Sequence, residues 1–113
     1  MDVRVKPIEF CGSSLHDLRA FPVSARREAG HQLDQVQRGQ EPDNWKPMNT
    51  IGSSVREIRI RSEEGAFRVI YIAKFKEAVF VLHCFQKQSQ KTRREDLALA
   101  TRRYKELMQE TLS

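Results

Sequence analysis

Basic side chains concentrate in the second half of the chain. Residues 51–113 contain thirteen Lys and Arg against eight Asp and Glu, whereas the seven basic and seven acidic residues of positions 1–50 cancel, so the net charge of +5 belongs to the second half. Guanidinium groups are permanently charged and can hold a phosphate through two hydrogen bonds. A basic excess of this kind is typical of proteins that bind a polyanion, nucleic acid above all.

Three arginines occupy informative positions in predicted strands. Arg59 and Arg61 alternate with apolar residues and therefore share one face of a strand. Arg68 lies in a strand that is otherwise apolar, where an unpaired buried charge is costly. Arg68 therefore either binds an anion or pairs with a carboxylate of the sheet such as Glu57.

The motifs of common hydrolases and metal enzymes are missing from the sequence. There is no Gly-rich phosphate loop, HExxH, Cys-x-x-Cys or G-x-S-x-G. Cys11 and Cys84 fit no metal-ligand spacing and are predicted to be reduced, structural thiols. The three histidines, His16, His31 and His83, are scattered along the sequence, and each is expected to be structural. A catalytic role is kept as an alternative only for His83, at the end of a predicted strand. No metal and no cofactor are predicted.

The elements of the first half follow from apolar spacing and turn residues. Residues 3–8 alternate apolar and basic side chains and predict a short strand, with Pro7 favouring a sheet edge or a strand end. Two helices are expected next, the first capped at Ser13–Ser14 and the second ending at Gly39. Residues 40–50 contain two prolines and predict a loop.

The second half predicts three consecutive strands and a helix. The strands cover 56–61, 67–75 and 79–85, and the first two are joined by turn residues at 62–65. Residues 92–95, with sequence Thr-Arg-Arg-Glu, form a capping box that opens the last helix.

This order of elements predicts one α+β domain over residues 1–113, in the arrangement β-α-α-β-β-β-α. We expect helices on one face of a small, mainly antiparallel sheet and the basic strand residues on the other. No apolar run approaches the roughly 18 to 20 residues that span a bilayer, and the N-terminus lacks an apolar stretch of signal-peptide length. The cytoplasm is the expected location, without membrane contact.

Three segments resemble the signature strands of RelE/HigB-type toxins, in the phage-derived HigB-like branch of the RelE/ParE superfamily. They are the basic strand 58–61, the aromatic-Arg-hydrophobic-x-Tyr strand 67–71, and the pattern Phe-x-Lys-x-x-x-Lys-Thr at 85–92 before the last helix. The similarity extends over nearly the whole chain, including the helical hairpin and the Trp-Lys-Pro segment at 45–47.

The resemblance implies the toxin of a type II toxin–antitoxin system, acting as a metal-independent endoribonuclease (mRNA interferase) on the ribosome. Its implied partners are the ribosome, mRNA and a helix-turn-helix antitoxin of the HigA/XRE type. Carried over onto this sequence, the implied catalytic residues are Arg59, Arg68, Lys87 and Lys91, with Arg68 at the scissile phosphate. Further RNA contacts are expected from Arg56, Arg61 and Lys74.

The implied reaction uses the ribose 2′-hydroxyl as nucleophile and gives a 2′,3′-cyclic phosphate and a 5′-hydroxyl. Guanidinium donors can stabilise the charge that develops on the phosphoryl oxygens. A lysine crowded by cations has a lowered pKa and can accept the proton of the 2′-hydroxyl. Lys87 is the first candidate base and Lys91 the second, while Glu57 stands where RelE proteins can carry a basic residue, so the base stays open.

Two other interpretations remain at this point. A ParE-like toxin has a similar fold but binds DNA gyrase without cutting nucleic acid, and it has no need of a phosphate-binding cluster such as Arg68, Lys87 and Lys91. A decayed prophage protein would retain only the fold and antitoxin binding. The leading prediction is the ribosome-dependent endoribonuclease.

Overall fold

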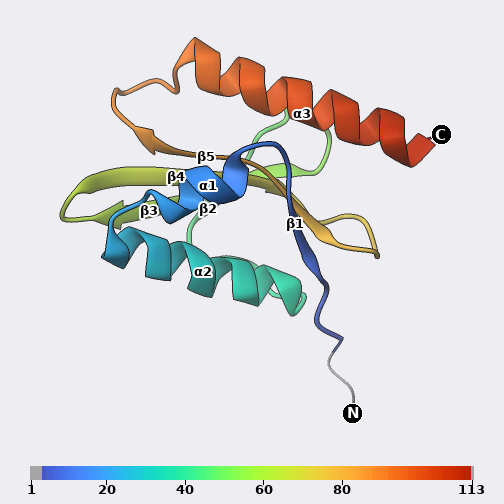
Figure 1. Cartoon of the computed structure of the whole chain (residues 1–113), viewed down its shortest axis with the longest axis horizontal. Coiled ribbons are helices and arrows are strands. Elements are labelled where there is room, and N and C mark those ends of the chain that lie inside the picture. The colour runs from blue at the N-terminus through green and yellow to red at the C-terminus, as the bar shows by residue number, and fades with distance from the viewer. Residues whose placement is uncertain (1–3, 113) are drawn as a thin grey trace.

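The computed structural model describes residues 4–112 and folds them into a five-stranded sheet with three helices (Figure 1). In chain order the elements are β1 (Ile8–Phe10), α1 (Ser14–Arg19), α2 (Val23–Gln37), β2 (Trp45–Pro47), β3 (Val55–Ser62), β4 (Gly65–Ile72), β5 (Val79–Lys87) and α3 (Arg94–Leu112). The strand order is β1-β5-β4-β3-β2, with β1 parallel to β5 and the other neighbours antiparallel. The α+β class and the mainly antiparallel sheet are thereby confirmed.

The helices cover both faces of the sheet, so the expectation that they share one face is wrong. α1 and α2 pack on one face and α3 packs on the other (Figure 1). The cause lies in β4, where Phe67, Val69 and Tyr71 face α2. Ile70 and Ile72, which alternate with them, face α3. A strand that is apolar on both faces needs a covering layer on each side.

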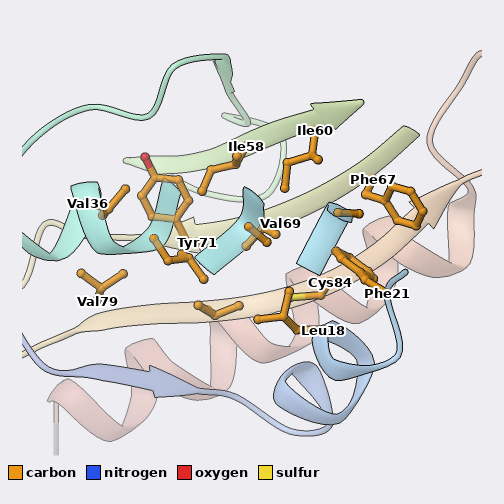
Figure 2. Close-up of a cluster of buried hydrophobic side chains, with 14 residues drawn as sticks. Leu18, Phe21, Val36, Ile58, Ile60, Phe67, Val69, Tyr71, Val79 and Cys84 are labelled. Carbon is orange, nitrogen blue, oxygen red and sulfur yellow. The ribbon is translucent and has the colours of Figure 1, made fainter. Parts of the chain in front are cut away.

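The larger core lies between the helical hairpin and the sheet (Figure 2). α2 contributes the stripe Ala25, Ala29, Leu33 and Val36, all buried and spaced at helical intervals. The ring centroid of Phe21, which follows α1, lies 4.8 Å from that of Phe67 on β4. This packing fixes the hairpin against β3, β4 and β5.

The second core lies between α3 and the opposite sheet face. α3 contributes Leu97, Ala100, Tyr104, Leu107 and Met108, the apolar stripe of the helix. β3 and β4 contribute Val55, Ile70 and Ile72, which lie away from the turn that joins these two strands. The end of β3 and β4 near their connecting turn therefore lies outside this core.

The ends of the first two helices follow their sequence signals. Ser13 is the N-cap of α1, although its hydroxyl accepts no backbone N–H of the helix and instead donates to Asp17 Oδ2 at 2.9 Å. Gly39 follows the end of α2 with φ of +82°, a conformation that glycine adopts without steric cost.

The first strand and the loop before β3 differ from their predictions. The predicted strand 3–8, of which Val3 lies outside the described residues, is replaced by Ile8–Phe10. The Lys6 N–H donates to Gln37 O, at the end of α2, so the chain before β1 is fastened to the helix. The predicted loop 40–50 contains the short strand β2 at the sheet edge, where proline is tolerated.

Two further boundaries are displaced. The predicted strand 67–75 ends at Ile72. α3 begins at Arg94, and its first backbone bond runs from the Leu97 N–H to Arg93 O, so the N-cap lies at Arg93 and not at Thr92. The capping box expected at residues 92–95 therefore does not coincide with the start of the helix.

Candidate functional site

Strand register places four of the predicted basic residues on the sheet face that α3 covers only in part. Arg59 of β3 lies directly opposite Arg68 of β4, and Arg61 lies opposite Ala66. Lys87 of β5 also lies opposite Ala66, from the other side. Because directly opposed residues of antiparallel strands point to the same face, the four cations share that face.

β2 adds a lysine that the sequence analysis assigned to a loop. Lys46 lies opposite Glu57, which precedes Arg59 by two residues on the same face of β3. The strand signal was hidden by its length of three residues and by Pro47. We call these six side chains the basic cluster: Lys46, Glu57, Arg59, Arg61, Arg68 and Lys87. It holds five cations around one carboxylate.

Arg68 and Glu57 form the buried centre of the basic cluster. Their side chains are 6% and 5% exposed, and Arg68 Nε lies 3.6 Å from Glu57 Oε1. The same oxygen lies 4.0 Å from Arg59 Nε. Arg68 Nη1 donates to Phe67 O at 3.1 Å, while Nε finds no hydrogen-bond partner in the part of the chain that the structure describes. The carboxylate pairing that the sequence left open is thus present, and the Arg68 side chain is buried.

The surroundings of Arg68 act on its charge in opposite directions. Burial lowers the pKa of Arg68, and Glu57 raises it. Arg59 and Arg61 lower it again, because like charges disfavour the protonated form. Glu57 is therefore the group that favours a buried guanidinium charge among other cations.

Lys87 lies at the border of the basic cluster and is half-buried. Burial is the largest of the effects that lower the pKa of Lys87. The pKa is lowered further by the positive charges of Arg68, Arg59 and Lys46, whereas the negative charge of Glu57 raises it. A lysine with a lowered pKa is more often neutral and can then accept a proton. This agrees with the crowding by cations expected from the sequence.

A histidine–aspartate pair adjoins the basic cluster. His83 Nε2 lies 2.8 Å from Asp96 Oδ1, and the imidazole stacks on Phe85 with ring centroids 5.0 Å apart. Phe85 lies opposite Arg68 in the sheet. Since Asp96 belongs to the first turn of α3, the pair ties the start of that helix to β5. Sequence reasoning missed this partner because α3 was placed on the other face.

The remaining predicted residues lie outside the basic cluster. Lys91 is exposed in the segment between β5 and α3. Arg56 lies opposite Tyr71 on the face covered by α2, and its guanidinium carbon lies 4.0 Å from the ring centroid of Trp45. Lys74 follows the end of β4 and lines the same pocket as Arg56. The proposed RNA contacts Arg56 and Lys74 are thus on a different surface from Arg61.

Burial raises the pKa of the Cys84 thiol to about 12 and also raises that of Cys11, and both cysteines are free. Within residues 4–112, no group of three or more His, Cys, Asp or Glu side chains is arranged to hold a metal ion. In the same range, no helix has the length and apolar character needed to cross a membrane.

Comparison with known proteins gives a family and a fold. Residues 16–105 match the model of the phage-derived Gp49-like protein family. No curated protein matches the sequence significantly. Among solved structures, a double arginine-to-alanine mutant of the E. coli toxin RelE in the free state is similar, with a TM-score of 0.66, 18% sequence identity, and coverage of 88% of this chain and 97% of that chain. At this identity the likeness establishes the fold.

Proposed function

Because the chain belongs to the phage-derived Gp49-like family, a RelE-like toxin family, we propose that it is a toxin that cleaves ribosome-bound mRNA as an endoribonuclease. The observation that supports this activity is the basic cluster, in which five cations meet one carboxylate and leave a local charge of +4 (five minus one). An anionic phosphate is the complementary ligand for such a surface.

The exposure of the cluster suggests an order of contacts with the substrate. Lys46 and Arg61 are exposed and meet the RNA backbone first. The Arg59 side chain is 31% exposed and lies directly opposite the buried Arg68 in the sheet. A phosphate that enters the cluster competes with Glu57 for Arg68, whose Nε makes no hydrogen bond in the described chain. Arg68 then stabilises the charge that develops on the phosphoryl oxygens.

The proton transfers are assigned to lysines. The 2′-oxygen bonds to phosphorus as its proton passes to the neutral Nζ of Lys87. The bond from phosphorus to the 5′-oxygen breaks, and the 5′-oxygen takes up a proton from solvent or from the ammonium group of a second lysine. The lowered pKa of Lys87 supports its role as the base. Lys91, exposed in the segment after β5, is the second candidate for either transfer.

Cleavage should depend on the ribosome. The basic cluster supplies positive charge, and we assign the in-line orientation of the 2′-oxygen and the 5′-oxygen to the decoding site, since misplacement of reacting groups by 1 Å can cost about 100-fold in rate. Purified protein is expected to cut mRNA on programmed ribosomes at least about 100-fold faster than the same transcript alone. Gel analysis of end-labelled RNA measures both rates. Equal rates on free and bound transcript would contradict the proposed mechanism.

The proposed partner is a helix-turn-helix antitoxin of the HigA/XRE type that covers the basic surface. Expression of this chain alone should arrest bacterial growth, and coexpression of an antitoxin of this type from an adjoining gene should restore it. Colony counts after induction measure the effect. Normal growth at high levels of folded protein would favour the decayed-protein interpretation, which retains the fold without the activity.

A further inference from the structure

A second basic pocket lies on the α2 face of the sheet, away from the basic cluster. It has a volume of about 380 Å³ and lies between the end of α2, the start of β3 and the chain that follows β4. Its wall includes Lys6, Glu41, Arg56, Tyr71 and Lys74. We call it the Tyr71 pocket. Two of its residues, Arg56 and Lys74, are basic positions that the proposed cleavage does not use.

The hydroxyl of Tyr71 is the unusual feature of this pocket. Tyr71 is 1% exposed, yet the proton of its hydroxyl has no acceptor among the described residues. Figure 2 shows the ring beside Val36, with the hydroxyl directed away from the other labelled side chains. Burial raises the pKa of Tyr71, whereas Arg56 lowers it by donating toward the hydroxyl oxygen and by its positive charge. The hydroxyl stays protonated, and its proton is left to donate. Buried polar groups normally have partners, so this donor calls for a ligand.

Three cations, Lys6, Arg56 and Lys74, line the same pocket as this hydroxyl. Arg56 is held over the Trp45 ring at 4.0 Å and approaches Glu41, whose side chain is 66% exposed, only to 3.8 Å. Such an exposed ion pair is weak and is easily exchanged for a better anion. Lys6 Nζ donates to Ala73 O at 2.7 Å and to Phe75 O at 2.8 Å. An ammonium has three protons, so one remains for a ligand.

We propose that the Tyr71 pocket binds a phosphate group through the Tyr71 hydroxyl, Arg56, Lys6 and Lys74. One neutral donor and three cations against the single carboxylate of Glu41 match the many acceptor oxygens and the charge of a phosphate. The pocket and the basic cluster lie on opposite faces of β3 and β4, so this site binds its ligand independently of the proposed cleavage.

Trp45 provides a direct readout of binding, because it is the one tryptophan of the sequence and Arg56 stacks on it. Inorganic phosphate is titrated into the ribosome-free protein at constant ionic strength, balanced with chloride, while Trp45 fluorescence is recorded. We expect a saturable change. Tyr71→Phe should weaken phosphate binding about tenfold or more, the usual effect of losing a hydrogen bond to a charged group. The variant should fold, since the hydroxyl it loses donates no hydrogen bond in the described chain.

Lys105→Gln is the matched control, because Lys105 is an exposed cation of α3, outside both the Tyr71 pocket and the basic cluster. It should leave the phosphate titration unchanged, and Lys74→Gln should weaken it. A 2′-O-methylated RNA hexamer distinguishes the source of the phosphate: displacement of inorganic phosphate indicates an RNA backbone, and no displacement indicates a free phosphate. A signal that does not saturate, or one that Tyr71→Phe leaves unchanged, would overturn the proposal.

Discussion

Replacing Arg68 with alanine is expected to slow single-turnover cleavage on programmed ribosomes roughly 100- to 1000-fold, the usual effect of removing a preorganised donor to transition-state charge. The guanidinium of Arg68 is buried beside Glu57, so its charge acts where water is excluded. The rate is measured at saturating protein, which removes differences in affinity from the comparison.

The structure requires a control for stability in this experiment. Arg68→Ala leaves the buried Glu57 carboxylate without its main partner, and breaking a buried ion pair typically costs about 3–5 kcal/mol. The double variant Arg68→Ala with Glu57→Gln removes that unpaired charge and should recover most of the lost stability, as measured by urea unfolding. Its cleavage rate should stay low. A double variant that is stable and cleaves normally would refute the role of Arg68, and a gyrase-binding toxin would become the leading alternative.

Replacing Lys87 with methionine is expected to lower the cleavage rate by about 100- to 10,000-fold, the range for loss of a general base. Lys87→Arg keeps the positive charge but cannot supply a neutral base near neutral pH, so it should be almost as slow. Single-turnover rates on programmed ribosomes measure both. A nearly normal rate for Lys87→Arg would show that Lys87 contributes only charge and would move the base to Lys91.

The role of Lys87 as the general base fixes the direction in which the cleavage rate changes with pH. A lysine base acts in its neutral form, so the rate should rise with pH and level off above the pKa of Lys87, which lies below the ordinary lysine value. Lys46 is one of the cations that lower this pKa. In Lys46→Gln the rise should therefore move to higher pH, whereas a titrating group of the ribosome would give an unchanged profile.

Period-two alternation predicted the faces of β3 and β4 from the sequence. It placed Arg59 and Arg61 together on one face of their strand, and the observed register confirms this. Arg68, predicted to lie in an otherwise apolar strand, shares its face with Ile70 and Ile72. The alternation does not indicate how deep a side chain lies. Burial of Arg68 depends on the neighbouring β5, which places Phe85 directly opposite it. The pairing of Arg68 with Glu57 was therefore available only as an alternative.

Contacts between distant elements were less predictable. The run Val69–Ile72 is apolar without interruption, which is typical of a strand buried on both faces and could have indicated that α3 lies opposite the hairpin. The strand β2 was not predicted, because a segment of three residues that includes a proline is too short to show an alternation of apolar and polar side chains. The residues that line the Tyr71 pocket are widely separated in the sequence, from Lys6 to Lys74. No local sequence pattern could therefore have predicted that they lie together.

The parallel pairing of β1 with β5 constrains the order in which the chain can fold during its synthesis. Ile8 pairs with Val79, so β1 cannot join the sheet until a residue 71 positions later (79 minus 8) has been synthesised. The apolar stripe of α2, complete at Gln37, is likewise covered fully only when β5 has emerged. At roughly 5 to 20 residues per second, the 42 residues from Gln37 to Val79 take about 2 to 8 s to translate. During that interval the helical hairpin of the nascent chain is exposed, and the basic cluster cannot assemble before Lys87 has been added.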